Sequence, residues 1–201
     1  MSLAAIQKKA KAKPSIVIIY GPSGLGKTTL AVGSKNPIVL QTEEGLGILT
    51  NNRDIPHFPL SKDYDTFYGY LKALVDADEL EYNTLVIDSL DWLEPLIHAK
   101  TCEAHKQPSI ESFGYGRGYN EALKYWREVL DLVNRLRNEK KMRIVMIAHN
   151  QIKAFHDPST EAYDRHELKM HKAASALVLE ASDMCLFLNY KKGTVKVQGS
   201  K

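Results

Sequence analysis

The stretch IVIIYGPSGLGKTTL, residues 16–30, joins an apolar run to a glycine-rich turn. The run is rich in β-branched side chains and is typical of a strand buried inside a sheet. The turn matches the pattern G-x-x-x-x-G-K-[ST] from Gly21 to Thr28. Glycines allow backbone N–H groups to turn inward around phosphate oxygens, and a helix beginning near Lys27 directs its N-terminus at the same anion. The stretch therefore predicts a strand, a phosphate-binding loop and a helix, in that order.

The same motif predicts how a nucleotide is held. Lys27 is expected to reach the β- and γ-phosphates of ATP, and the Thr28 hydroxyl to ligate Mg²⁺. The remaining residues of the turn are expected to surround the phosphates. The full set of expected nucleotide-binding residues is Gly21, Pro22, Ser23, Gly24, Leu25, Gly26, Lys27, Thr28 and Thr29.

A second acidic element completes such a site in other phosphate-loop proteins. Asp88 directly follows the apolar run Leu85–Ile87 and therefore ends a predicted buried strand. An aspartate at this place holds Mg²⁺ together with the loop hydroxyl. The alternative is that Asp88 caps the helix that follows, a position that aspartate also favours.

Predicted strands and helices alternate along the chain. Strands are expected at Ser15–Tyr20, Pro37–Gln41, Thr84–Asp88, Arg143–Ala148 and Asp183–Leu188, and helices at Thr28–Gly33, Asp63–Ala77, Leu90–His105 and Asn120–Lys140. Most of these strands are continuous apolar runs, which is typical of strands buried on both faces of a parallel sheet. The sequence therefore predicts a three-layer α/β domain with a mostly parallel central sheet.

The length of 201 residues suits a single core, so we expect one domain at 15–201 after a basic segment at 1–14. Two stretches, Gln107–Tyr119 and Lys153–Lys172, lack a clear period and are expected to be long loops. Long loops in a compact domain are usually functional or disordered.

Composition limits the remaining classes. The formal net charge of +3 does not by itself require a nucleic-acid partner. The 2 cysteines, Cys102 and Cys185, rule out a disulfide framework and indicate a reducing compartment. Cys185 lies in an apolar run and is expected in the core. No apolar run approaches the length of a membrane span, so we expect a cytoplasmic protein with no membrane partner.

Four motifs, GPSGLGKTT, IVLQTEEGLG, LVIDSLDWL and MIAHNQI, occur in this order over nearly the whole chain. In this respect the sequence resembles the RecA-type ATPase core. It resembles more closely the small phage-encoded RecA-like nucleotide-binding proteins linked to single-strand annealing and recombination. The resemblance implies a RecA-like P-loop NTPase fold that binds Mg²⁺ and ATP and acts on single-stranded DNA in the bacterial host of a phage.

The resemblance also assigns catalytic candidates. Glu43 is the first candidate for the base that activates the attacking water, with Glu44 beside it as the second. Ser89 rather than an acidic residue follows Asp88, so the base has to come from elsewhere, and Asp91 is a weaker substitute. In the stretch HNQI the resemblance makes Gln151 the first candidate for sensing the γ-phosphate.

His149 is the second candidate for that sensor because it lies nearer the predicted strand end. The alternative reading of this stretch is a strand end capped by polar side chains. The sensor interpretation is preferred, because the phosphate loop, Glu43 and Asp88 also end or follow predicted strands and can converge on one nucleotide.

The two irregular stretches correspond, by the same resemblance, to loops along the DNA path. Aromatic faces next to cations suit single-stranded nucleic acid. The candidate DNA contacts are Phe113, Tyr115, Arg117 and Tyr119 in the first stretch, and Lys153, Arg165, Lys169 and Lys172 in the second. The alternative is a solvated surface, and the mixed charges of the second stretch favour that alternative.

The function that the resemblance implies is an ATPase that works as a homo-oligomer, either a ring or a filament. One alternative is a small-molecule kinase with a phosphate loop, although such kinases usually close an arginine-rich lid and Lys153–Lys172 contains one arginine, Arg165. Another is a nucleotide-dependent, non-catalytic protein of phage assembly.

Overall fold

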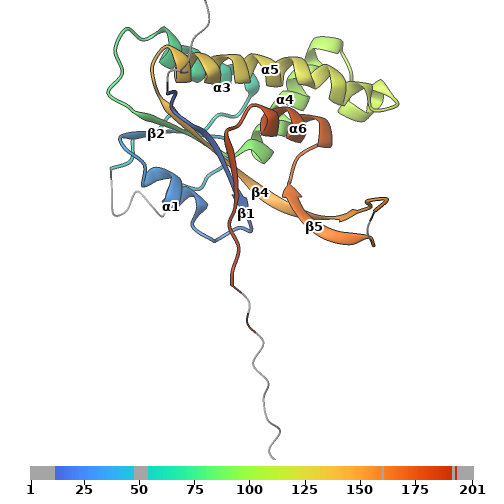
Figure 1. The fold of residues 1–201 in the computed structure, drawn as a ribbon. Helices are drawn as coiled ribbons and strands as arrows, with labels where there is room; N and C mark the ends of the chain where they lie inside the picture. The colour runs from blue at the N-terminus through green and yellow to red at the C-terminus, as the bar shows by residue number, and fades with distance from the viewer. Residues whose placement is uncertain (1–11, 48–53, 160, 192, 194–201) are drawn as a thin grey trace, which may run out of the picture.

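A computed structural model describes residues 12–47, 54–159, 161–191 and 193, and it contains a six-stranded sheet (Figure 1). Five strands lie side by side and parallel in the order β2 (Pro37–Gln41), β3 (Thr84–Asp88), β4 (Arg143–Phe155), β1 (Ile16–Gly21) and β6 (Met184–Phe187). The strand β5 (Tyr163–Leu168) pairs antiparallel with the far end of β4. The helices are α1 (Lys27–Val32), α3 (Tyr64–Asp76), α4 (Leu90–His105), α5 (Arg117–Asn138) and α6 (Lys172–Glu180), with a short 3-10 helix η2 (Ile110–Phe113).

Both faces of the sheet are covered. Ile16 and Ile18 of β1 point into a large core shared with α3, α4, α5 and α6. Val17 and Ile19, the alternate residues, point into a smaller core with α1. Figure 1 shows α3 to α6 on one side of the sheet and α1 on the other. Because successive side chains of a strand point to opposite faces, a strand buried on both faces is apolar throughout. The three-layer α/β prediction with a mostly parallel sheet is confirmed.

The longest helix, α5, buries the apolar stripe that its sequence predicts, including Trp126, Val129, Val133 and Leu136. It begins at Arg117, three residues before the expected start. Its N-cap Gly116 has φ +71°, a conformation that glycine adopts without strain. The sequence did not predict this earlier start, because residues 117–119 do not extend the apolar stripe of the helix.

The prediction of a loop over Lys153–Lys172 is wrong. Residues Asn150–Phe155 of β4 pair with Tyr163–Leu168 of β5 to form a hairpin that projects beyond the sheet, and α6 begins at Lys172. Half of these paired residues are exposed, and only Leu168 is buried. Because only Leu168, at its end, enters the core, its sequence shows neither an apolar run nor clear alternation.

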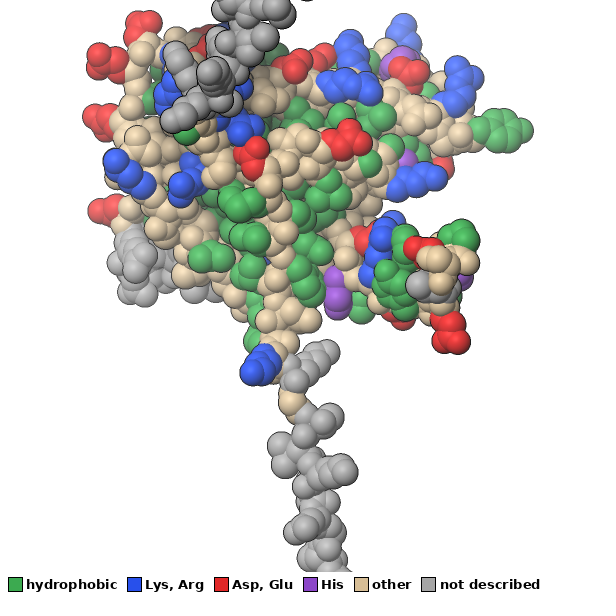
Figure 2. All heavy atoms as spheres, in the orientation of Figure 1, with side chains coloured by type: hydrophobic (Ala, Val, Ile, Leu, Met, Phe, Trp, Pro, Cys, Tyr) green, Lys and Arg blue, Asp and Glu red, His purple; other side chains and the backbone are tan. Residues whose placement is uncertain are grey.

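The edge strand β6 also departs from expectation. All four of its residues are exposed, including Cys185, which was expected in the core. Figure 2 shows apolar side chains gathered over this edge of the sheet. Met184, Leu186 and Phe187 are exposed large hydrophobic residues. The apolar sequence of β6 predicted burial, and this prediction is wrong, because β6 is the last strand in the sheet order and has a neighbouring strand on one side only.

Most of the expected basic segment, residues 1–11, lies outside the described residues. Within the part of the chain that the structure describes, no helix is long and apolar enough to cross a membrane.

Close packing leaves no room for a side chain at Gly21, the last residue of β1. A Cβ added to Gly21 would lie 2.2 Å from the carbonyl oxygen of Leu188, which is backbone and cannot move away alone. We expect Gly21→Ala to lower the free energy of unfolding by about 1–3 kcal/mol. In contrast, Gly69 lies in α3 with nothing within 4 Å of an added Cβ, and Gly69→Ala should raise it by about 0.5–1 kcal/mol. Urea unfolding of both variants checks this, and equal shifts would contradict it.

Candidate nucleotide-binding site

The carboxyl ends of neighbouring strands meet at one cavity. Gly21 at the end of β1 lies opposite His149 in β4, and Gln41 at the end of β2 lies opposite Asp88 in β3. Ligands of open α/β sheets bind at this edge. The cavity, of about 320 Å³, is lined by Ser23, Gly24, Gly26, Lys27, Thr28, Thr29, Glu43, Glu44, Gly45, Asp88 and His149.

The phosphate loop places a buried cation at this cavity. Lys27 is 5% exposed, and its Nζ donates to the carbonyl oxygens of Gly21, at 3.0 Å, and Pro22, at 2.9 Å. Among the described residues, no carboxylate forms an ion pair with it. Burial lowers the pKa of Lys27, while the negative charge of Asp88 acts in the opposite direction. A buried ammonium without a carboxylate partner fits an anionic ligand such as a polyphosphate.

Two glycines shape this loop. Gly24 and Gly26 both have φ +79°, a left-handed conformation that other residues rarely adopt. An added Cβ on Gly24 would meet nothing within 4 Å. The requirement for glycine at this position is therefore the backbone conformation that turns the loop, and not the space around it.

The hydroxyl of Thr28 and the carboxylate of Asp88 lie together in the cavity. Thr28 Oγ1 donates to Asp88 Oδ2 at 2.7 Å, and Asp88 is 3% exposed. Burial raises the pKa of Asp88, although the hydrogen bond from Thr28 opposes this. Ser89, and not Asp88, is the N-cap residue of α4, so the capping alternative for Asp88 is wrong. Paired hydroxyl and carboxylate oxygens fit the preference of Mg²⁺ for oxygen ligands.

Thr42, which the sequence did not single out, connects the ends of β2 and β3. Its backbone N–H donates to the carbonyl of Asp88 at 2.7 Å, and its hydroxyl donates to the carbonyl of Ser89 at 2.7 Å. The same hydroxyl accepts the Ser89 N–H at 2.9 Å. These bonds fix the chain that continues into Glu43 next to Asp88. The only sequence signal was a polar residue directly after an apolar strand.

The two adjacent glutamates differ in environment. Glu43 is half-buried and Glu44 is exposed, although both line the cavity. Burial raises the pKa of Glu43, and the nearby charges of Asp88 and Asp91 raise it further, against the effect of His149. A carboxylate with a raised pKa is a better proton acceptor than one in water. This environment favours Glu43 over Glu44 as a base.

The structure separates the two sensor candidates. His149 lines the cavity. Gln151 lies two residues further along β4, and its Nε2 donates to the carbonyl oxygens of Leu168, at 2.7 Å, and Met170, at 3.2 Å. Gln151 is not among the cavity-lining residues. Its amide therefore holds the turn that follows β5.

Asp91 contacts His149 and not the cavity. Burial favours its neutral form, but hydrogen bonds from His149 outweigh this and hold the pKa of Asp91 below its usual range. In turn, the hydrogen bond to Asp91 raises the pKa of His149, although burial opposes it. With its carboxylate engaged in this way, Asp91 is a poor candidate for the base.

The first group of candidate DNA contacts lies around η2 and the start of α5. Tyr115 is fully exposed and has φ +48° between two glycines, and Arg117 is also exposed. Tyr119 instead stacks on His171, with ring centroids 4.0 Å apart, and donates its hydroxyl to Glu111. Phe113 packs edge-on against the ring of His105. Two of the four side chains, Tyr115 and Arg117, thus remain available at the surface.

The second group lies on the hairpin and the turn after it. Lys153 lies directly opposite Arg165, and Phe155 opposite Tyr163, so all four share one face. The Arg165 guanidinium lies 3.9 Å from the centre of the Phe155 ring and pairs with Glu167 at 2.5 Å. Lys169 and Lys172 are exposed nearer the core.

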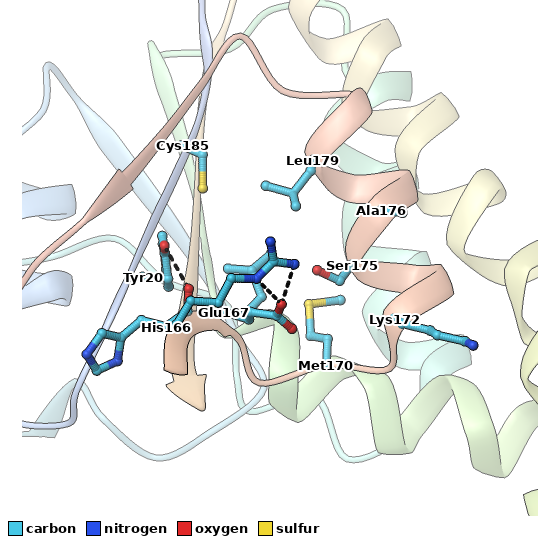
Figure 3. A pocket seen from close by; sticks show the side chains of 11 residues that line it. Tyr20, His166, Glu167, Met170, Lys172, Ser175, Ala176, Leu179 and Cys185 are labelled. Carbon is cyan, nitrogen blue, oxygen red and sulfur yellow. Dashed lines mark hydrogen bonds and ion pairs between the residues drawn. The ribbon is translucent and has the colours of Figure 1, made fainter. Parts of the chain in front are cut away.

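Arg165 and Lys172 also line a second cavity, of about 470 Å³, between β5 and α6. Figure 3 shows Ser175 and Leu179 of α6 on one side of it and Tyr20 and Cys185 on the other, whereas the Lys172 side chain extends away from them. This cavity shares no lining residue with the nucleotide cavity.

The chain matches the family model described as an AAA domain over residues 13–201. It is also 24% identical over 178 residues to the SPbeta prophage-derived uncharacterized protein YorG of Bacillus subtilis (strain 168). That alignment covers 87% of this chain and 50% of the relative, so the chain spans about half the length of the curated relative it matches. Because the family model extends over nearly the whole chain, and the cavity combines a phosphate loop with a strand-end aspartate, the chain belongs to the AAA domain family and is a nucleotide-binding P-loop NTPase.

Proposed function

We propose that this protein binds ATP with Mg²⁺ and hydrolyses it as a RecA-like ATPase that acts on single-stranded DNA in phage recombination or annealing. The observation that carries the ATPase part is the shared cavity of Lys27, Thr28, Asp88, Glu43 and His149. The relative's printed description as prophage-derived supports the phage setting.

The proposed chemistry assigns one task to each residue. Glu43 accepts a proton from water as that water attacks the γ-phosphorus, and the bond to the β–γ bridging oxygen breaks to release ADP and phosphate. Lys27 stabilises the charge that develops on the phosphate oxygens. Thr28 and Asp88 would hold Mg²⁺, which neutralises phosphate charge when bound. His149, which lines the cavity, is the proposed contact to the γ-phosphate in place of Gln151.

The base assignment gives a direct prediction. We expect Glu43→Gln to lower ATP turnover about 100-fold, because the amide cannot accept the proton, while ATP affinity stays close to wild type. Glu44→Gln is the matched control, since Glu44 is exposed on the same loop. Steady-state ATPase assays and nucleotide titrations check both variants. A larger loss of turnover in Glu44→Gln would reverse the assignment.

The hairpin supports the DNA part of the proposal. Lys153 and Arg165 are like charges directly opposite each other on an antiparallel pair, an arrangement that costs stability. Glu167 pairs with Arg165 and offsets part of its charge, whereas among the described residues no carboxylate forms an ion pair with Lys153. A phosphate backbone beside them would relieve the repulsion, and the exposed Tyr163 offers a face for base stacking.

The test is an ATPase and binding titration of the full chain with and without single-stranded DNA at low salt. We expect DNA to bind and to stimulate turnover, and Lys153→Ala/Arg165→Ala to weaken binding at least about 10-fold. Lys72→Ala/Arg135→Ala removes the same charges from exposed helical ion pairs and should have little effect. Absence of binding at low salt would contradict the DNA proposal, because phosphate contacts are strongest there.

Other outcomes of the same titration would identify the alternatives. Turnover that requires a small phosphate acceptor would indicate a kinase, and tight ATP binding without turnover would indicate a non-catalytic assembly protein. Assembly into a ring or filament and a cytoplasmic location are further parts of the proposal. They rest on the resemblance to RecA-like proteins.

A further inference from the structure

Asp91 is a buried carboxylate whose two oxygens both contact His149. It lies in the first turn of α4, and its side chain is 3% exposed. Its Oδ1 accepts the backbone N–H of His149 at 2.9 Å, and its Oδ2 lies 2.9 Å from Nδ1 of the same residue. Both oxygens therefore engage one histidine, through its backbone and its ring.

The strand pairing explains why this contact forms. Pairing of β3 with β4 ends at Asp88 and Ile147, so the His149 N–H lies beyond the reach of the β3 backbone. An unpaired N–H at this depth would be costly. The chain turns into α4 directly after β3, and the first turn of the helix brings Asp91 to the vacant position.

The contact also sets the orientation and protonation of the ring. An ionised carboxylate can only accept hydrogen bonds, so Nδ1 must carry a proton. The other ring nitrogen, Nε2, is then the one left for the nucleotide cavity that His149 lines. A histidine fixed in this way has one tautomer and one direction, which is how a carboxylate prepares an imidazole for a reacting group.

We propose that Asp91 is the positioning residue for His149, holding Nδ1 so that Nε2 faces the γ-phosphate of bound ATP. This inference rests on the proposed function, because it assigns His149 a contact with that phosphate. It reassigns Asp91 from a weak candidate base to a partner of the sensor. Among the described residues, Asp91 is the only carboxylate within ion-pair distance of His149.

The first test needs no ATP. Long-range ¹H–¹⁵N NMR of labelled, nucleotide-free protein reports which nitrogen of the neutral His149 ring carries the proton. We expect Nδ1–H in the wild type and a mixture or the opposite tautomer in Asp91→Asn. An Nε2–H ring in the wild type would overturn the proposal, whether or not the protein hydrolyses ATP.

The second test is kinetic. We expect Asp91→Asn to lower kcat about 10- to 100-fold, the range for an outer partner that orients a reacting group, with the KM for ATP nearly unchanged. His149→Ala should show a similar loss, and adding Asp91→Asn to His149→Ala should cause little further loss, because the two side chains act as one unit. Asp78→Asn, at an exposed site, is the matched control.

The outcomes separate this inference from the proposed function. Additive losses in the double variant, or wild-type turnover in Asp91→Asn, would overturn the role of Asp91 while leaving the ATPase proposal intact. Absence of turnover in the wild type, together with the expected Nδ1–H signal, would contradict the ATPase proposal but support the contact between Asp91 and His149.

Discussion

Lys27→Ala is expected to lower kcat/KM for ATP about 1,000-fold, the upper part of the range for one electrostatic donor at a reacting oxygen. Lys27 is 5% exposed, and its ammonium donates hydrogen bonds to two loop carbonyls. Its charge is therefore already positioned and poorly screened before a nucleotide arrives, which makes it strong towards phosphate. Alanine removes both the charge and its hydrogen bonds, and no other lysine or arginine of the described residues lines the cavity.

Steady-state ATPase kinetics and nucleotide titration measure this effect. Lys35→Ala is the matched control, because Lys35 is exposed and lies just beyond α1. It should keep wild-type kinetics, and circular dichroism should show both variants folded. Turnover in a folded Lys27→Ala protein within about 10-fold of wild type would contradict the role of the phosphate loop.

Trp126→Ala is expected to lower the free energy of unfolding by about 3–5 kcal/mol. Trp126 is 1% exposed on α5, where it packs into the large core between helix and sheet. Truncation to alanine leaves a cavity that rigid neighbours fill only in part. Because total stabilities of single domains are about 5–15 kcal/mol, this one change can remove a large fraction.

The indole nitrogen of Trp126 leads to a second prediction, on the stability of a phenylalanine variant. Among the described residues, Nε1 of Trp126 has no hydrogen-bond partner although it is buried. Trp126→Phe removes this unsatisfied group while keeping most of the ring, so its loss should be clearly smaller than that of alanine.

The matched control is Trp92→Ala, because Trp92 is 52% exposed on α4 and its loss should change stability by less than about 0.5 kcal/mol. Urea unfolding followed by circular dichroism measures all three variants. Equal losses at Trp126 and Trp92 would contradict the assigned core.

The sequence predicts the elements whose pattern lies within a single segment. The strand before the phosphate loop, the strand that ends at Asp88 and the apolar stripe of α5 each depend on neighbours within one segment, and the structure shows these elements where the sequence predicts them. The sequence did not predict the hairpin, because Asn150–Phe155 and Tyr163–Leu168 are held together by backbone pairing, which requires no particular pattern of side chains. The sequence also did not predict the exposure of β6, because an apolar strand at the edge of a sheet has the same kind of sequence as one in the middle.

The sequence by itself determined that this chain has a phosphate-binding loop between a buried strand and a helix, with an aspartate at the end of a second buried strand. Only the tertiary structure showed that Glu43 is more buried than Glu44, and that His149 rather than Gln151 lines the cavity. It also showed that both carboxylate oxygens of Asp91 contact His149. These distinctions depend on strand register and on contacts between segments about 60 residues apart. A sequence motif carries the chemistry of its residues, but the direction of each side chain is set by the strands and helices packed against it.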